Sequence, residues 1–375
     1  MDYKQLFTLP EHTIYLNCAA QGPLSNVGAV AVQQAVKDKQ FPAFLDLKYG
    51  EEKIGNLRKA ISTLIDFPEK NIALANSTGW GINVLAQALP LKSDDEVLMS
   101  AGQFPSNSAP WEVLKSKGVV IRKIEMTDYV FDIPKFEKAL TSKTKVVCLE
   151  WVHFVSGDCI PLKEIKEICS RKNILLIVDV TQGLGAIPFS MTECKPDAVV
   201  CSAYKWLLSP YGCGFFALSD KLISDLEPKT INWLCFDEGV WEGNFENYRK
   251  TLSQTAKRFD VFSFMGYLNI PAMTESIKLL NELKTIETFN YTRELIDLLN
   301  SSIDPKLYEP LNKGEASRQS LIASFKVKKS NAEKLVQDLF DKKIYVSFRQ
   351  GYLRVSPFFY NTREDIEGLL KELHN

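Results

Sequence analysis

Helical and strand-like hydrophobic patterns alternate along this chain from about residue 50. In EEKIGNLRKAISTLI (51–65), apolar residues recur every three or four positions, which predicts an amphipathic helix. Short apolar runs typical of buried strands follow: NIALA, EVLMS, VVIRKI, KVVCLEW, ILLIVDV and AVVCS. Helix-like stretches such as IPLKEIKEICSRK (160–172) lie between most of them. This rhythm predicts an α/β fold with a large, mostly parallel sheet between two layers of helices.

The pattern changes after about residue 265. A long helical stretch (270–302) leads to a strand (320–327), a helix (331–343), two strands (344–348 and 352–356) and a last helix (361–375). Thr362 and Asp365 have the spacing of a capping pair at the start of that last helix. We therefore expect an N-terminal arm (1–14), a large domain (15–268), and an interdomain helix with a small C-terminal α+β domain (269–375).

Composition and charge exclude several classes of protein. The chain has 375 residues and a formal net charge of -1, so we expect no binding to nucleic acid or to anionic membranes. No apolar run approaches the ~20 residues that span a bilayer, and no signal peptide is evident. Eight cysteines without a CxxC pair are typical of a reducing cytoplasm. The three histidines are far apart in sequence, so we expect no metal site.

Polar side chains follow several of the predicted strands, where ligands gather in open α/β sheets. Asp179 and Gln182 follow ILLIV, and Ser202, Tyr204 and Lys205 follow AVVC. Each residue alone has a structural explanation as a cap, an ion pair or a core side chain. Lys205 is unusual because it lies among apolar and turn residues, where a charged amine is costly unless it is paired or neutral.

Two further stretches complete the set. Ser77, Thr78 and Gly79 would open a helix after NIALAN and offer hydroxyl and N–H groups to a phosphate. Phe104 follows EVLMS at the same edge. A lysine amine, a carboxylate, an aromatic face and a phosphate cradle are together what pyridoxal 5'-phosphate requires.

The chain resembles the class V aminotransferase family, which includes cysteine desulfurases, selenocysteine lyases and kynureninases. The stretches that carry the resemblance run in the family's order: YLNCAAQGPLS (15–25), STGWGIN (77–83), GQFPSNSAPW (102–111), VDVTQGLGAIPF (178–189), SAYKWLLSPYGCGFF (202–216), AKRFD (256–260) and LRVSPFFYNTREDI (353–366). The resemblance implies the pyridoxal-phosphate fold type I and a homodimer with its active site at the subunit boundary.

The resemblance also implies residue roles. Lys205 is the Schiff-base lysine, Asp179 the acid on the pyridine nitrogen and Phe104 the residue stacked on the ring. Arg354 takes the α-carboxylate of a small amino-acid substrate, a task that suits the two-pronged guanidinium. The remaining expected site residues are Gln182 near the ring hydroxyl, Ser77, Thr78, Gly79, Ser202, Tyr204 and Ser263 around the phosphate, and Asn17 and His153 near the substrate.

Departures from the family pattern leave the reaction open. Phe262 stands where relatives carry a small glycine, just before Ser263, and no cysteine occurs after Cys235, where desulfurases hold their nucleophile. Transamination is the expected reaction. A lyase acting on C–S, C–Se or C–C bonds is the alternative, with Cys18 or Cys235 as the thiols to consider. A binding protein that kept the fold without catalysis is a third, which the intact Lys205, Asp179 and Arg354 disfavour.

Overall fold

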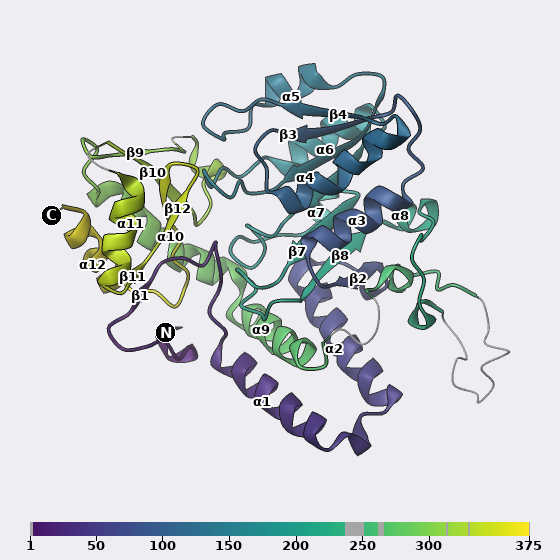
Figure 1. Ribbon diagram of the computed structural model, residues 1–375, viewed down its shortest axis with the longest axis horizontal. Helices are drawn as coiled ribbons and strands as arrows, with labels where there is room; N and C mark the ends of the chain where they lie inside the picture. Colours follow the sequence, from purple (N-terminus) through teal and green to yellow (C-terminus); the bar gives the residue numbers. More distant parts are fainter. Residues whose placement is uncertain (1–2, 237–250, 262–265, 313, 329–330, 375) are drawn as a thin grey trace.

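The computed structural model describes residues 3–236, 251–261, 266–312, 314–328 and 331–374. A seven-stranded sheet forms its centre (Figure 1), with the strand order β2-β8-β7-β6-β5-β3-β4. The strands are β2 (Ile72–Ala75), β3 (Glu96–Ser100), β4 (Val120–Ile124), β5 (Thr144–Glu150), β6 (Leu175–Asp179), β7 (Ala198–Ser202) and β8 (Gly214–Leu218). The pairs β3–β4, β3–β5, β5–β6 and β6–β7 are parallel, whereas β8 runs antiparallel to both of its neighbours. The predicted mostly parallel sheet is confirmed.

Helices cover both faces of this sheet, and its strands are therefore buried on both sides. One hydrophobic cluster joins Val97, Val146 and Ile177 to helix α3; the other joins Leu98, Val147 and Leu176 to residues of helices on the opposite face. The alternation of neighbouring strand residues between the two clusters follows the period of two of a β-strand. The helices of this part are α1 (Asn26–Gln40), α2 (Leu47–Ile65), α3 (Thr78–Ala88), α4 (Pro105–Glu112), α5 (Ile133–Ala139), α6 (Leu162–Arg171), α7 (Met191–Cys194), α8 (Asp220–Asp225) and α9 (Asn269–Leu283).

A small antiparallel sheet forms the C-terminal part, in the order β12-β13-β10-β9. Its elements are α10 (Thr285–Ser302), β9 (Tyr308–Pro310), β10 (Ala323–Val327), α11 (Ala332–Asp341), β12 (Ser347–Arg349), β13 (Tyr352–Val355) and α12 (Arg363–His374). The expected capping pair is present, because the N–H of Thr362 donates to the Asp365 carboxylate and the N–H of Asp365 donates to the Thr362 hydroxyl.

The N-terminal segment reaches this C-terminal part. Strand β1 (Ile14–Tyr15) pairs in parallel with β11 (Ile344–Tyr345), and Tyr3 packs edge-on against Tyr291 and Phe359. Figure 1 shows this segment passing beside β11 and leading into α1. Short 3-10 turns complete the described chain at Tyr3–Leu6, Pro42–Phe44, Glu69–Asn71, Val113–Lys117, Trp233–Cys235, Ala256–Phe259 and Ala316–Arg318. No helix in the described ranges is long and apolar enough to cross a membrane.

Candidate active site

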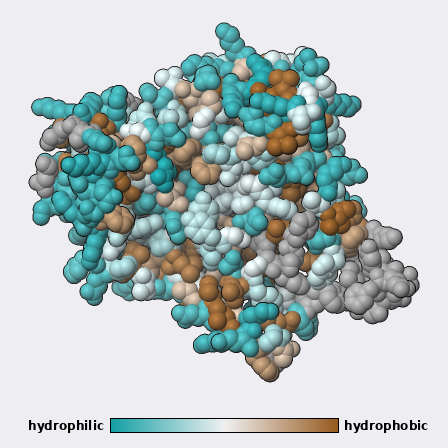
Figure 2. Space-filling view, in the orientation of Figure 1, coloured by the Kyte–Doolittle hydropathy of each residue, from teal (hydrophilic) through white to brown (hydrophobic). Residues whose placement is uncertain are grey.

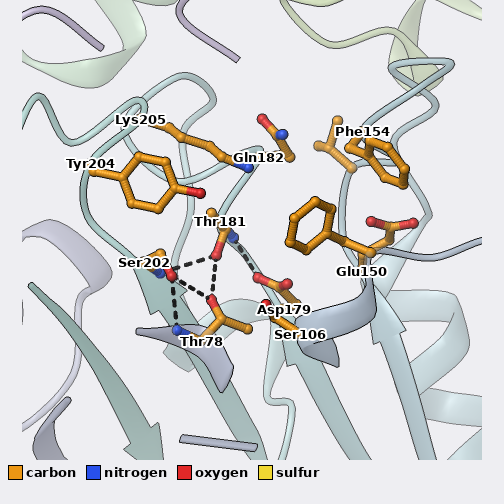
Figure 3. Close-up of a pocket in the computed structure, with 12 residues that line it drawn as sticks. Thr78, Ser106, Glu150, Phe154, Asp179, Thr181, Gln182, Ser202, Tyr204 and Lys205 are labelled. Atoms are coloured by element: carbon orange, nitrogen blue, oxygen red, sulfur yellow. Dashed lines mark hydrogen bonds between the residues drawn. The ribbon is translucent and has the colours of Figure 1, made fainter. Parts of the chain in front are cut away.

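A cavity, with about 370 Å³ of empty space when the open solvent at its mouth is included, lies where β5, β6 and β7 end and α3 and α4 begin (Figure 3). This is the carboxyl edge of the parallel strands, where ligands of open α/β sheets bind. The cavity brings together seven of the residues predicted from the sequence. The full lining is Thr78, Phe104, Ser106, Glu150, Val152, Phe154, Asp179, Thr181, Gln182, Ser202, Tyr204 and Lys205.

Lys205 lies on a turn that follows β7, and its side chain is buried at 6% exposure. Burial lowers the pKa of its amine to about 8, an effect that the charge of Asp179 partly opposes. No carboxylate lies within ion-pair distance of this amine in the described ranges. Lys205 Nζ lies 5.2 Å from the centre of the Phe104 ring and 5.6 Å from that of the Tyr204 ring. The site therefore holds a lysine whose amine can be neutral near physiological pH.

The turn carrying Lys205 is held from outside the sheet by Gly22. The N–H of Gly22 donates to the carbonyl oxygen of Tyr204 at 2.9 Å. A Cβ atom at Gly22 would lie 2.0 Å from the Lys205 carbonyl oxygen, which no side chain permits. The close approach of the two chains thus requires glycine here, and it fixes where the lysine backbone sits.

Two buried carboxyl groups line the cavity on neighbouring strands. Glu150 and Asp179 are partners in the register of β5 and β6. Burial raises the pKa of Asp179, and the hydrogen bond from the N–H of Thr181 (2.9 Å) and the charge of Lys205 act against that rise. Burial also raises the pKa of Glu150, with the charge of Asp179 as the next cause. Asp179 has no cationic side chain as a direct partner in the described structure, so a protonated ring nitrogen would complete its environment.

Three hydroxyl groups form a cluster at the start of α3 (Figure 3). The Thr78 and Thr181 hydroxyls lie 2.7 Å apart, the Ser202 hydroxyl donates to that of Thr78 at 3.1 Å, and the Thr78 N–H donates to Ser202 at 2.8 Å. The N–H of Gly79 has no hydrogen-bond partner among the described residues. Ser77 caps α3 by accepting from the N–H of Trp80 (3.3 Å) and does not line the cavity. Hydroxyls and a free N–H at a helix start form an anion site.

The aromatic and amide groups expected beside a ring are also present. Phe104 precedes α4, is 37% exposed and turns a face of its ring toward the Lys205 amine. Tyr204 stacks on Tyr211 with ring centres 4.3 Å apart. Gln182 accepts from the Trp206 indole and donates to the Ala19 carbonyl oxygen, both at 3.0 Å. Its amide has a second N–H, which remains for a ligand in the cavity.

Arg354 is buried outside the cavity lining, on β13. It is 1% exposed, donates to the Phe154 carbonyl oxygen (2.7 Å) and to the Ser347 hydroxyl (3.3 Å), and leaves its Nε without a partner. Burial lowers its pKa to about 9, and its charge in turn lowers the pKa of Lys205. Asn17 accepts a hydrogen bond from the same Ser347 hydroxyl. Arg354 is thus a buried cation near Lys205 with capacity for an anion.

His153, expected from the sequence near the substrate, is buried next to the cavity and does not line it. It is 3% exposed, stacks between Tyr129 (4.9 Å) and Phe154 (5.2 Å), and accepts the Val155 N–H at Nδ1. Its Nε2 lies 3.2 Å from a Glu150 oxygen. Burial lowers the pKa of His153 to about 3, so the imidazole is neutral and this contact is not an ion pair. His153 is outside the cavity lining and stacks on the lining residue Phe154, and its expected contact with the substrate stays a prediction.

None of the eight cysteines lines the cavity, and burial raises the pKa of every one of their thiols. Cys18 is fully buried, with its thiol 3.9 Å from the Lys205 carbonyl oxygen, and Cys235 is fully buried on a 3-10 turn. The described residues also contain no cluster of three or more side chains that could hold a metal ion. The site has neither a thiolate nor a metal cage.

The sequence reasoning missed four polar or aromatic lining residues: Ser106, Glu150, Phe154 and Thr181. Glu150 closes β5 and could have been found by the same rule that singled out Asp179 at the end of β6. Thr181 lies two residues after Asp179, and Ser106 two after Phe104. Phe262 and Ser263 lie outside the described residues.

The residues present fit pyridoxal 5'-phosphate. The buried amine of Lys205 suits the aldehyde, the buried Asp179 without a cationic partner suits the ring nitrogen, and the face of Phe104 turned toward Lys205 suits the ring. The hydroxyls of Thr78 and Ser202, with the N–H of Gly79, suit the phosphate.

Comparison with known proteins places the chain in a family. The pattern of the class-V aminotransferases matches residues 48–369. The chain is 24% identical to an uncharacterised aminotransferase of Bacillus subtilis, over 99% of this chain and 96% of that protein. It is 24% identical to a probable cysteine desulfurase of Borreliella burgdorferi, over 85% and 80% of the two chains.

Solved structures share the fold. The cystine C–S lyase C-DES, in complex with cysteine persulfide, matches with a TM-score of 0.90 at 19% identity, over 97% of this chain and 98% of that one. The apo cysteine desulfurase of Thermococcus onnurineus matches with a TM-score of 0.88 at 18% identity, over 99% and 96%. The chain therefore belongs to the class-V aminotransferase family of pyridoxal-phosphate enzymes, and it has their fold type I architecture.

Proposed function

We propose that this enzyme transfers the amino group of a small α-amino acid, with pyridoxal 5'-phosphate carried on Lys205. The observation that supports this most is the buried amine with its pKa lowered to about 8, beside a buried carboxyl group at the end of the next strand. When bound, the cofactor supplies an electron sink for the bonds at the substrate Cα. The protein supplies the attachment point, the electrostatics and the proton transfer.

The lining residues take the following roles in this proposal. Asp179 holds a proton on the ring nitrogen, Phe104 packs on the ring face, and Gln182 donates to the ring hydroxyl. The phosphate is held by the N–H of Gly79 and by hydroxyls of Thr78, Ser202 and Tyr204, while Ser77 fixes the start of α3. Ser263, outside the described residues, remains proposed as a further phosphate contact.

Lys205 also acts as the proton carrier. A general base is most effective when its pKa lies near the working pH, and burial brings this amine close to that range. Arg354 binds the substrate α-carboxylate through its unpartnered Nε and a second N–H. Asn17 orients Arg354 through the shared Ser347 hydroxyl. An amine for the proton and a guanidinium for the carboxylate are the two groups that transamination needs from the chain.

The absence of an available thiolate favours transamination over desulfuration. A persulfide-forming cysteine must reach the substrate as a thiolate, and burial holds all eight thiols protonated outside the cavity. The shared fold with the cystine C–S lyase C-DES keeps a lyase as the second candidate, provided that the lysis needs no protein thiol. Lys205, Asp179 and Arg354 together disfavour a binding protein without catalysis.

The test is a screen of amino acids against the cofactor-loaded enzyme, with separate assays for 2-oxo acid, alanine and sulfide. Transamination predicts a 2-oxo acid and transfer of the amino group to an added acceptor, without sulfide. Sulfide release from cysteine or cystine would instead assign lyase chemistry. A Lys205→Ala variant is the control, and turnover by that variant would contradict the proposal in either form.

We propose further that the enzyme is a homodimer in a reducing compartment such as the cytoplasm. Of the fifteen residues of α1, Gly28 and Ala35 are buried, while Val27, Val30 and Val36 are 44%, 63% and 41% exposed. Figure 2 shows apolar side chains exposed at the lower part of the molecule, where Figure 1 places α1. A second subunit would cover this face. The eight unpaired cysteines support the reducing compartment.

A further inference from the structure

One face of the small C-terminal sheet carries two arginines, Arg349 and Arg354, whereas one guanidinium is enough to bind one carboxylate. Arg354 on β13 is opposite Ser347 on β12, and Tyr352 is opposite Arg349. Residues two apart on a strand point to the same side, so Arg349, Ser347, Tyr352 and Arg354 share one face. The intervening Leu353 belongs to the hydrophobic core on the other face.

This shared face is turned toward the active site. Arg354 donates to the carbonyl oxygen of Phe154, a cavity-lining residue, and Tyr352 packs edge-on against Tyr129 at 6.2 Å. Tyr129 in turn stacks on His153, behind Phe154. Arg349 lies on the same face, opposite Tyr352 and two residues beyond Ser347 on β12.

Arg349 and Arg354 act on each other electrostatically. After burial, the charge of Arg349 is the next cause that lowers the pKa of Arg354. Neither guanidinium has a carboxylate partner among the described residues: Arg349 donates to the carbonyl oxygen of its neighbour Phe348, at 2.9 Å. Two adjacent cations without counter-charge destabilise each other, and a ligand with two negative groups would relieve that repulsion.

The spacing suits a short ligand. Arg349 and Arg354 are diagonal neighbours across the strand pair, and Cβ atoms in such pairs are roughly 7–8 Å apart or slightly closer. Arg354 is buried and held by Phe154 and Ser347, whereas the long side chain of Arg349 can reach a second carboxylate two or three carbons from the one that Arg354 binds. A monocarboxylic substrate would leave Arg349 without a partner.

We propose that Arg349 determines specificity for a dicarboxylic amino acid, or its 2-oxo acid, by binding the carboxylate remote from the reacting carbon. This rests on the proposed function, in which Arg354 binds the α-carboxylate. The substrate class is therefore a four- or five-carbon compound with a carboxylate at each end.

The chain offers a matched control on the same face. Lys326 on β10 is opposite Tyr352, on the other side from Arg349, and is also exposed enough to be substituted safely. Glu309 on β9 is opposite Lys326 in the register, although its ion pair is with Lys328, at 3.6 Å. If ligand binding depended only on the total positive charge of this face, substitutions of Arg349 and of Lys326 would weaken it equally. If Arg349 binds a carboxylate directly, only its own substitution weakens binding.

The experiment measures ligand binding without catalysis. Cofactor-free protein is titrated calorimetrically with succinate and with butyrate, which have the same number of carbons and differ in the second carboxylate. We expect succinate to bind about ten- to hundred-fold more tightly, the effect of one more charge-assisted interaction. Arg349→Gln should reduce succinate binding to the level of butyrate and leave butyrate unchanged, whereas Lys326→Gln should leave both unchanged.

Two results would overturn the proposal: equal binding of the two ligands by the wild-type protein, or a succinate preference that survives Arg349→Gln. Arg349→Lys, which keeps the charge, should retain part of the preference and so distinguishes lost charge from misfolding. Attachment of pyridoxal phosphate to Lys205 is measured separately by visible absorbance. Failure of that attachment would contradict the proposed function, and failure of the succinate preference would contradict only the assignment of Arg349.

Discussion

Individual residues in this site are defined by burial as much as by identity. Lys205 and Asp179 were expected from the sequence because each follows an apolar strand. The sequence could not show that Asp179 has a second carboxyl group, Glu150, beside it, because the register of two parallel strands is a tertiary property. His153, polar and near the motif in sequence, stacks on Phe154 outside the cavity lining, a packing contact that the sequence does not show.

The lowered pKa of Lys205 predicts a pH dependence for cofactor attachment. Only the neutral amine reacts with an aldehyde, so the rate of attachment to cofactor-free protein should rise as the pH rises through about 8 and then level off. Stopped-flow absorbance measures this rate, with N-acetyl-lysine as the reference for titration of the cofactor itself. Because Asp179 raises the pKa of Lys205, Asp179→Asn should move the midpoint to lower pH. A midpoint near that of free lysine would contradict this prediction.

The buried thiols predict that no cysteine is needed for turnover. A variant with both Cys18→Ala and Cys235→Ala should retain its activity on the amino acid found by the screen, since burial keeps both thiols protonated. The cofactor absorbance of the variant serves as the control for folding. Lost activity with unchanged absorbance, together with a persulfide trapped on the wild-type protein, would count against this prediction.

At the scale of elements, the period of the hydrophobic pattern predicted well whether a segment is a helix or a strand, but it did not predict where a helix is interrupted. The helix stretch 270–302 is two helices, α9 and α10, interrupted at Lys284, whose φ of 59° is left-handed. Its apolar pattern continues through the break, so the sequence could not show it. Strand β9 has three residues and no period to detect. The turns around the site are fixed by close approaches, such as that of Gly22 to Lys205, which no local pattern records.

Two glycine substitutions should have opposite effects on stability. Gly22→Ala places a Cβ against the Lys205 carbonyl oxygen and should lower the free energy of unfolding by about 1–3 kcal/mol, the usual effect of overpacking, and weaken cofactor binding. Gly55 lies inside α2, and a Cβ added there would have nothing within 4 Å. Gly55→Ala should therefore raise the free energy of unfolding by about 0.5–1 kcal/mol. Urea denaturation measures both. If the two substitutions changed the free energy of unfolding equally, the close contact at Gly22 would not require glycine.

For the whole molecule, the sequence predicted the order of layers and the separate C-terminal sheet, and the family comparison confirmed the fold class. The division at residue 268 stays a prediction, although α9 begins at Asn269. What the sequence could not give is how distant segments meet: the N-terminal segment pairs with β11, and Arg354 reaches Phe154 from 200 residues away. The chain folds so that residues from both ends meet at one site.

The exposed apolar face of α1 predicts a dimer that a single charge disrupts. Val30→Glu places a carboxylate in the proposed interface, where burial of an unpaired charge is costly, so sedimentation velocity should show monomers. Val113→Glu, at a position that is 69% exposed on the other side of the sheet, is the matched control and should leave the dimer intact. A monomeric wild-type protein, or a Val30→Glu variant that stays dimeric, would contradict the interface.

The site of cofactor attachment is the most direct test of the central claim, that Lys205 carries pyridoxal phosphate. The loaded protein is reduced with borohydride, digested and examined by mass spectrometry, with Lys205→Ala treated in parallel. We expect loss of the yellow colour on reduction and a pyridoxyl adduct on the peptide that contains Tyr204, Lys205 and Trp206, absent from the variant. An adduct on any other lysine of the wild-type protein, or the same adduct yield in the variant, would contradict it.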